Sequence, residues 1–291
     1  MANQAGAPSG ALIDAIAGKS VGATQAALPL DPLENRILLC HATGLTRIQL
    51  ITQSERILQG DEAARLAALV QRRLDGEPIA YIVGRREFFG LDFQVNDAVL
   101  IPRPDTELIV ELALERLPAR GRMLDMGTGS GAIAVALAHS RPDAQVCALD
   151  VSPAALEVAR ANAAANGAAV RFLRSDWFAA LQADNNAPET FDLIVSNPPY
   201  IAAGDTHLSQ GDLRFEPAGA LTDHADGLSA LRIIIDGAPG HLVHGAWLLL
   251  EHGYDQAAAV RALLAQRGFT DVQSWRDLGD NERVSGGRIM G

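Results

Sequence analysis

The spacing of apolar residues divides the chain into an N-terminal helical part and a longer C-terminal part with a different period. Between residues 12 and 74, apolar positions such as Leu33 and Ile37 recur near helical spacing, and residues 63–74 form another amphipathic stretch. Glycines separate these segments as natural breaks. We therefore predict a small helical domain over residues 11–87, in which no chemistry is visible.

The period changes to two after residue 90. In LDFQV, residues 91–95, apolar side chains alternate with Asp and Gln, which is typical of a half-buried strand. The expected return strand is VLI, residues 99–101, with Asn96 and Asp97 at the turn. We predict a β-hairpin linker over residues 88–103 that joins the two domains.

Strand-like and helix-like patterns alternate over residues 104–291. Repeated βα units of this kind indicate an α/β domain built on a doubly wound parallel sheet, closed here by two C-terminal strands. The predicted strands are Met123–Met126, Val146–Asp150, Val170–Leu173, Leu193–Ser196, Trp247–Glu251, Val272–Trp275 and Val284–Ile289.

A glycine-rich turn joins the first of these strands to a helix in LDMGTGSGAIAVALA, residues 124–138. Gly127, Gly129 and Gly131 allow a sharp bend and a close approach of a ligand to the backbone. Asp150 follows about 20 residues later, at the end of the next strand, where a carboxylate accepts hydrogen bonds from ribose hydroxyls. The arrangement indicates a nucleotide-like ligand and is also compatible with the dinucleotide-binding pattern.

Two further acidic positions bear on which ligand binds. Asp125, beside the glycine turn, disfavours a pyrophosphate and suits a sulfonium such as that of S-adenosylmethionine, although it can equally accept from loop N–H groups. Asp176 and Trp177 follow the third strand and could hold an adenine, one by its amino group and one by its ring. A loop carboxylate and a partly buried tryptophan explain that pair equally well.

The segment SNPPYI, residues 196–201, ends the fourth predicted strand with two prolines, which cannot donate to a sheet. In open α/β sheets, ligands bind beyond the carboxyl ends of the strands, so Asn197 points into the same crevice as the glycine loop. The Asn197 side-chain oxygen and the Pro198 carbonyl could accept both hydrogens of an amide or amino group and orient its lone pair toward a methyl donor. Pro199 stiffens the segment, and Tyr200 could pack on the flat group.

Composition and net charge indicate which partners the protein can bind and in which cellular compartment it works. The net charge is −11, so tight binding of nucleic acid is disfavoured. Two cysteines, Cys40 and Cys147, are too few for a disulfide scaffold and favour a reducing compartment. Neither a signal peptide nor an apolar run long enough to span a membrane is visible, so we expect a cytoplasmic protein without a membrane partner.

The glycine loop with Asp150 and the NPPY segment resemble those of S-adenosylmethionine-dependent amino-methyltransferases. Further stretches are similar to the HemK/PrmC family of peptide chain release factor glutamine-N5 methyltransferases, and the resemblance runs from about residue 28 to the C-terminus. These stretches are GEPIAYIVGRREFFGLDFQV (76–95), LIPRPDTE (100–107), GDLRFEP (211–217), LLLEHG (248–253) and DNERV (280–284).

The resemblance implies a Rossmann-like, seven-stranded methyltransferase domain after the helical domain and the hairpin. It implies methyl transfer from S-adenosylmethionine, without a metal, to the N5 nitrogen of the glutamine in the Gly-Gly-Gln motif of class I release factors. Residues 1–10 have no counterpart in the family, and we expect them to be disordered. The implied cofactor contacts are Gly127, Thr128, Gly129, Ser130, Gly131, Asp150, Trp177 and Asn197, and the implied substrate contacts and catalytic residues are Asn197, Pro198, Pro199 and Tyr200.

Two alternatives remain at this point. A DNA adenine-N6 methyltransferase shares the acceptor chemistry, but it must flip a base from a duplex, which the acidic charge and the lack of a basic recognition domain disfavour. A binding protein on an inactive methyltransferase fold would have a damaged glycine loop or NPPY segment, and both are intact.

Three other groups carry weaker signals. His241 and His244 have a spacing that suits one helical face, but no third metal ligand is near them in the sequence. His252 is interpreted as a surface or supporting histidine. Arg214 and Glu216 are expected to belong to a segment over the substrate channel, or simply to pair on the surface.

Overall fold

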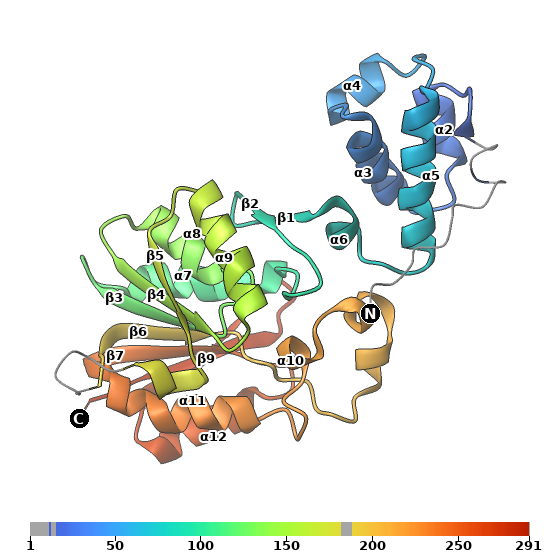
Figure 1. Cartoon of the computed structure of the whole chain (residues 1–291). Coiled ribbons are helices and arrows are strands. Elements are labelled where there is room, and N and C mark those ends of the chain that lie inside the picture. The colour runs from blue at the N-terminus through green and yellow to red at the C-terminus, as the bar shows by residue number, and fades with distance from the viewer. Residues whose placement is uncertain (1–11, 13–15, 182–187, 291) are drawn as a thin grey trace. The chain divides into compact units, whose positions relative to one another are not determined.

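The computed structural model describes residues 12, 16–181 and 188–290, which form two compact units (Figure 1). One unit extends to Gly84 and the other begins at Arg85. The disorder expected for residues 1–10 falls outside the described residues. In the described part of the chain, no helix is both long enough and apolar enough to cross a membrane.

The N-terminal unit consists of short helices around an apolar core, as predicted. Neighbouring residues cap both ends of α3 (Pro32–Thr43). The Asp31 side chain accepts from Leu33 N at 2.8 Å at its start, and Gly44 ends it in the left-handed region. Leu38 and Leu66 are fully buried where α3 and α5 pack together. The helices are α2 (Val21–Ala27), α3 (Pro32–Thr43), α4 (Arg47–Thr52), α5 (Gly60–Leu74) and α6 (Ile79–Val83).

The second unit begins with a β-hairpin in which the strand predicted at residues 91–95 is present and its predicted partner is not. Strand β1 (Arg85–Phe88) pairs antiparallel with β2 (Leu91–Gln94), so the return strand predicted at residues 99–101 is wrong. Phe89 and Gly90 form the turn with φ of 52° and 75°, which suits the twist of a two-residue hairpin loop. Three exposed polar residues precede Phe88 in β1, so the strand has no apolar alternation to detect.

A seven-stranded sheet forms the centre of this unit in the order β5-β4-β3-β6-β7-β9-β8. The first five of these strands are parallel, and β9 runs antiparallel to both of its neighbours. The predicted doubly wound sheet is therefore confirmed. The strands are β3 (Arg122–Met126), β4 (Gln145–Asp150), β5 (Val170–Arg174), β6 (Phe191–Ser196), β7 (Leu242–Glu251), β8 (Thr270–Arg276) and β9 (Glu282–Arg288).

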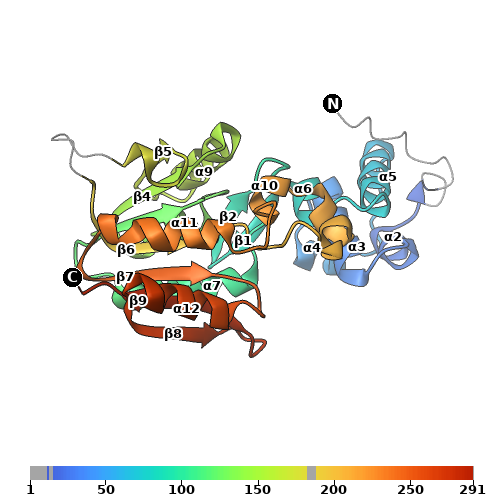
Figure 2. The same ribbon diagram turned by 90° about the horizontal axis from the view of Figure 1, so that it is seen from below.

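Helices cover both faces of the sheet (Figures 1 and 2). One face packs against α7 (Glu107–Arg116), α8 (Ala132–Ser140) and α9 (Pro153–Ala165), and the other against α11 (Ser229–Gly237) and α12 (Ala257–Arg267). Short helical segments occupy the loops, namely η1 (Pro104–Thr106), η2 (Trp177–Ala180), η3 (Thr206–Ser209), η4 (Gly211–Phe215), α10 (Ala218–Leu221) and η5 (Ala238–His241).

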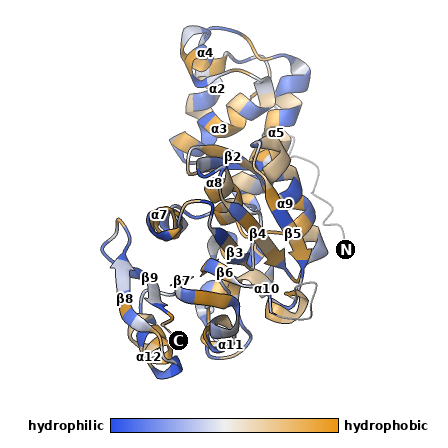
Figure 3. Cartoon of the chain, turned by 90° about the vertical axis from the view of Figure 1, so that its left-hand side faces the viewer, coloured by the Kyte–Doolittle hydropathy of each residue, from blue (hydrophilic) through white to orange (hydrophobic). Residues whose placement is uncertain are grey.

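The central strands are buried on both faces, as parallel strands between two helical layers must be (Figure 3). Leu124 of β3 pairs in register with Cys147 of β4 and with Ile194 of β6. The chain leaves β3 toward β4 and β5 and then crosses back, so that β6 lies on the other side of β3. The strand order therefore reverses at β3 and β6, where open α/β sheets bind ligands.

Candidate active site

A cavity of about 280 Å³ lies at the carboxyl ends of β3, β4 and β6. Each of these strands contributes the loop that follows it, and the segment before α7 closes another side. The lining includes Val99, Pro102, Arg103, Thr106, Gly127, Thr128, Gly129, Ser130, Asp150, Ser152, Asp176, Trp177, Asn197, Pro199 and Pro217.

The glycine loop turns away from β3 without any side chain that would fill the cavity. Gly127 and Gly129 have φ of 70° and 54°, and no atom lies within 4 Å of the position that a Cβ would take on either. The backbone N–H groups of Gly127 and Thr128 donate to Leu149 O of β4 at 3.0 and 2.9 Å. These two hydrogen bonds hold the loop against β4, and the space beside Gly127 and Gly129 stays open to a ligand.

Gly131 has a different environment from the rest of the loop. It precedes α8 with φ of 83°, and a Cβ there would lie 3.1 Å from Ala159 Cβ of α9 and 3.3 Å from Val135 Cγ2. Gly131 does not line the cavity, whereas Gly127, Thr128, Gly129 and Ser130 do. Its observed contacts are those of close packing between α8 and α9.

Asp125 lies beneath the loop and not in the cavity lining. Its side chain is fully buried, and Thr128 Oγ1 donates to Asp125 Oδ2 at 2.6 Å. Burial raises the pKa of this carboxyl to about 7, and the hydrogen bond from Thr128 opposes that shift. Of the two interpretations of Asp125, the geometry favours support of the loop over contact with a sulfonium.

Asp150 combines a structural contact with exposure to the cavity. Its Oδ2 accepts from Gly129 N at 2.9 Å, and its Oδ1 accepts from Ser152 N at 2.9 Å. A carboxylate oxygen has room for more than one donor, so both oxygens can still accept from a diol. The carboxylate that shapes the glycine loop is thus also the group that can hold a ribose.

Asp176 and Trp177 both line the cavity on the side of β5. Trp177 has a φ of 47°, which is uncommon for a residue with a side chain, and its carbonyl accepts from Ser175 Oγ at 2.6 Å. A strained residue of this kind persists only where its surroundings hold it, and such residues cluster at ligand sites. The arrangement suits a flat ring bounded by an indole and a carboxylate.

The NPPY segment leaves β6 beside the glycine loop, because β6 pairs with β3 up to Ser196. Asn197 and Pro199 line the cavity, whereas Pro198 is buried and Tyr200 packs among the apolar residues beneath α11 and α12. The Tyr200 carbonyl accepts from Gln256 Nε2 at 3.0 Å, which anchors the end of the segment. The structure thus brings two of the four NPPY residues to the cavity.

Arg103 and Glu216 correct one expectation from the sequence. Glu216 does not pair with Arg214 on the surface; it is buried, forms an ion pair with Arg103 and accepts from Ile101 N at 3.2 Å. Burial raises the pKa of Glu216, while the neighbouring Arg103 lowers it. This contact fixes the segment before α7 against the loop that carries Pro217, so that both line the cavity.

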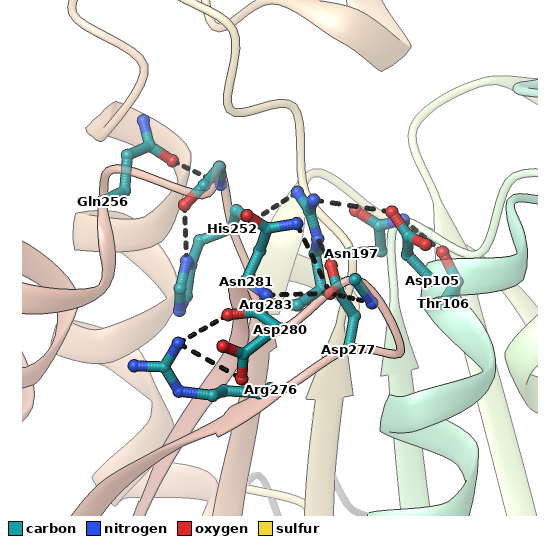
Figure 4. A network of polar contacts seen from close by, with 12 residues as sticks. Asp105, Thr106, Asn197, His252, Gln256, Arg276, Asp277, Asp280, Asn281 and Arg283 are labelled. Atoms are coloured by element: carbon teal, nitrogen blue, oxygen red, sulfur yellow. Dashed lines mark hydrogen bonds and ion pairs between the residues drawn. The ribbon is translucent and has the colours of Figure 1, made fainter.

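A polar network missed from the sequence lies behind Asn197 (Figure 4). Asn197 Nδ2 donates to Thr106 Oγ1 at 3.3 Å, and Arg283 contacts Asp105 at 3.4 Å and Asp277 at 3.2 Å. Asp105 and Thr106 come from the LIPRPDTE stretch and Arg283 from the DNERV stretch, and these two stretches were the one signal in the sequence that could have marked them.

Glu251, at the end of β7, is 1% exposed. Burial raises the pKa of its carboxyl to about 7, against hydrogen bonding from Thr106 and Tyr200 and the positive charge of Arg283. Of the two interpretations of His252, the structure favours the supporting one: His252 is buried, with Nε2 2.7 Å from Ser285 Oγ and Nδ1 2.8 Å from Gly253 O.

His241 and His244 do not share a helical face. His241 ends η5 and stacks on Phe178 with ring centroids 4.8 Å apart, and His244 belongs to β7. Among the described residues, no group of three or more His, Cys, Asp or Glu side chains is arranged to hold a metal ion.

Two family models match the chain. The methyltransferase small domain matches residues 105–221, and the PrmC N-terminal domain matches residues 24–84. A release factor glutamine methyltransferase from Burkholderia pseudomallei is 56% identical over 273 residues, which cover 91% of this chain and 94% of that protein. Its counterpart from Neisseria gonorrhoeae is 53% identical over 261 residues, covering 90% and 94%.

Among solved structures, a methyltransferase from Pyrococcus furiosus aligns with a TM-score of 0.53. The alignment covers 76% of this chain and 97% of that chain at 21% sequence identity. This likeness supports the methyltransferase fold of the C-terminal unit.

Proposed function

The chain belongs to the family of release factor glutamine methyltransferases, and on this premise we propose that it methylates the side-chain nitrogen of a glutamine in class I peptide chain release factors. The glutamine is that of the Gly-Gly-Gln motif, and the methyl donor is S-adenosylmethionine. The observation that carries the proposal is that Asn197 of NPPY and the open glycine loop line one cavity.

The residues of the cavity fit the proposed methyl donor, which supplies an electrophilic methyl group when bound. Gly127 and Gly129 leave space against the backbone, and Asp150 keeps acceptor capacity for ribose hydroxyls. Asp176 and Trp177 would bound the adenine. None of these contacts requires a phosphate, and the buried Asp125 beneath the loop disfavours one.

On the substrate side, the main task is to orient a poor nucleophile. An amide nitrogen shares its lone pair with the carbonyl, and two acceptors that take both N–H hydrogens turn that lone pair toward the methyl group. The Asn197 side-chain oxygen and the Pro198 carbonyl would be these acceptors. They would also stabilise the positive charge that develops on the nitrogen, so alignment and fixed dipoles replace a strong base.

The substrate loop suits a narrow cavity because glycine imposes little steric restriction on the residues next to it. We propose that the helical N-terminal domain and the hairpin bind the rest of the release factor. A short peptide with the same motif should then be a much poorer substrate than the folded factor.

Transfer of a labelled methyl group from S-adenosylmethionine to three acceptors tests the proposal. The acceptors are a purified class I release factor, a free Gly-Gly-Gln peptide and duplex DNA with adenines. We expect transfer to the release factor in large excess over the other two. Equal transfer to DNA would favour the adenine-N6 alternative, which the net charge of −11 disfavours.

A further inference from the structure

Gln256 joins three backbone segments beside the carboxyl ends of β6 and β7. It stands at the start of α12 (Figure 4), and its Oε1 accepts from Gly253 N at 2.9 Å, in the turn after β7. Its Nε2 donates to Tyr200 O at 3.0 Å, at the end of NPPY, and to Gly227 O at 3.1 Å, in the loop before α11. One half-buried amide thus uses its oxygen and both of its N–H hydrogens.

The three partners fix the orientation of this amide. A backbone N–H can only donate and a backbone carbonyl can only accept, so the oxygen of Gln256 faces Gly253 and its nitrogen faces the two carbonyls. A flipped amide would lose all three hydrogen bonds. His252 supports the same turn, because its Nδ1 lies 2.8 Å from Gly253 O and must carry a proton to donate to it.

Gly227 packs so tightly against this contact that no side chain fits there. Its φ is 81°, and a Cβ would lie 2.5 Å from Tyr200 O and 2.9 Å from Gln256 Nε2. The loop that carries Gly227 is folded around Asp223, whose carboxylate accepts from Gly227 N at 3.0 Å and from Ser229 N at 2.8 Å. Gln256 therefore ties the end of NPPY to a loop whose own shape is fixed.

The start of the NPPY segment is also anchored. Ser196, the last residue of β6, donates from its buried Oγ to Met126 O of β3 at 2.6 Å. Between the two anchors, the rings of two prolines restrict φ to about −65°. Few backbone torsions remain free, and these set the direction in which the Asn197 side chain and the Pro198 carbonyl point.

We propose that Gln256 is a positioning residue that fixes the end of the NPPY segment and thereby keeps the Asn197 side-chain oxygen and the Pro198 carbonyl aligned with the substrate amide. The inference rests on the proposed function, because it needs a substrate nitrogen that these two acceptors orient. Gln256 does not line the cavity, so its effect on the reaction passes through Tyr200. A misplacement of about 1 Å can cost on the order of 100-fold in rate.

Two substitutions of Gln256 separate its donors from its acceptor. Gln256→Glu keeps an oxygen toward Gly253 N but turns an acceptor toward both carbonyls, and Gln256→Met keeps a similar length without an N–H donor. The same two changes at Gln266 are the matched controls, because Gln266 lies on the same helix and is exposed.

Gly227→Ala disrupts the same contact from the opposite side, because its Cβ would displace both partners of the hydrogen bond. Its control is Gly167→Ala, which has a left-handed φ of 63° but no atom within 4 Å of its Cβ position. The control therefore carries the backbone strain without the clash.

The kinetic measurement is methylation of the intact release factor at saturating S-adenosylmethionine. We expect kcat to fall on the order of 10- to 100-fold in Gln256→Met, Gln256→Glu and Gly227→Ala, with KM and the dissociation constant of the cofactor within about 2-fold of wild type. Unchanged cofactor binding also shows that the cavity of each variant is folded. The double variant Gln256→Met/Gly227→Ala should lose less than the product of the two single losses, because both changes break one contact.

A measurement without release factor keeps the inference separate from the proposed function. The chain has three tyrosines, so a ¹³C label on the tyrosine carbonyls gives three signals, and the signal of Tyr200 is the one lost in Tyr200→Phe. A hydrogen bond draws electron density from the carbonyl carbon. The Tyr200 signal should therefore shift upfield in Gln256→Met and Gln256→Glu and stay in place in the Gln266 controls.

The position of Asn197 is followed in the same variants. In protein with ¹⁵N-labelled asparagine, the Asn197 side-chain signal is identified by its loss in Asn197→Asp. If Gln256 only stabilises the turn at Gly253, this signal should stay in place. If Gln256 positions the NPPY segment, the signal should move in Gln256→Met and Gln256→Glu.

The outcomes are distinct. A kcat of Gln256→Met within about 2-fold of wild type, a loss confined to cofactor affinity, or an unmoved Asn197 signal would overturn the positioning role. A wild-type protein that methylates no release factor would instead contradict the proposed function, and the Tyr200 and Asn197 signals would still show whether Gln256 holds the NPPY segment.

Discussion

The Gly129 amide donates to the Asp150 carboxylate across 2.9 Å, which joins the loop after β3 to the end of β4. The same carboxylate faces the cavity. Asp150 therefore holds the glycine loop in its open form and presents acceptors to whatever lies against that loop. We therefore propose that this one side chain couples the shape of the glycine loop to the recognition of a ribose.

We predict that Asp150→Ala weakens binding of S-adenosylmethionine. The loss of charge-assisted hydrogen bonds should reduce the binding free energy by about 1.5–3 kcal/mol. Calorimetric titration measures this, with Asp143→Ala on the surface as the control. An unchanged dissociation constant in Asp150→Ala would remove this residue from the cofactor site.

Gly131→Ala should destabilise the fold through its contact with α9. Its Cβ would lie 3.1 Å from Ala159 Cβ in a left-handed backbone conformation, a combined cost of about 2–4 kcal/mol. Gly167→Ala is the matched control, because Gly167 has φ of 63° with no atom within 4 Å of its Cβ position. Urea unfolding should show a clearly larger loss for Gly131→Ala; equal losses would leave backbone strain as the whole cause.

Asn197→Ala should reduce turnover far more than stability. Removal of one preorganised acceptor costs on the order of 10²–10³ in rate. The control Asn166→Ala removes an asparagine amide that bonds Asp92 O at 3.0 Å, away from the cavity, and should keep near wild-type turnover. Turnover of Asn197→Ala close to that of the control would refute the alignment mechanism.

Glu251 predicts a pH dependence of stability. Burial raises its pKa from 4.5 to about 7, so between these values the folded state keeps a proton that the unfolded state releases. Stability should therefore fall as pH rises from about 4.5 to 7, by up to about 3 kcal/mol from this group. Glu251→Gln should flatten that part of the curve of unfolding free energy against pH, and a variant curve parallel to wild type would contradict the shift.

Much of the fold could be predicted because its strands are buried on both faces and read as short apolar runs. The segments 123–126, 146–150 and 193–196 each lie within one or two residues of the observed strand ends. Strand β1 could not be found this way, since Arg85, Arg86 and Glu87 are all exposed. Its position depends on Phe88, which packs into the core of the C-terminal unit.

The lining of the cavity was predictable where a motif follows a strand, as for Gly129, Asp150 and Asn197. Contacts between distant segments were not: Glu216 pairs with Arg103, 113 residues earlier, and no local pattern distinguishes that partner from the nearby Arg214. Gly131 belongs to the glycine motif but does not line the cavity, and its close contacts are with Ala159 of α9. Spacing identifies a loop, and only the fold shows which of its residues face the ligand.

Mass spectrometry of a class I release factor after incubation with the protein and S-adenosylmethionine tests the central claim most directly. Fragmentation of the peptide that carries the Gly-Gly-Gln motif locates any added methyl group, with Asn197→Ala as the inactive reference. We expect one methyl group on the side-chain nitrogen of that glutamine in the wild-type reaction. An unmodified glutamine, or a methyl group on another residue, would contradict the assignment.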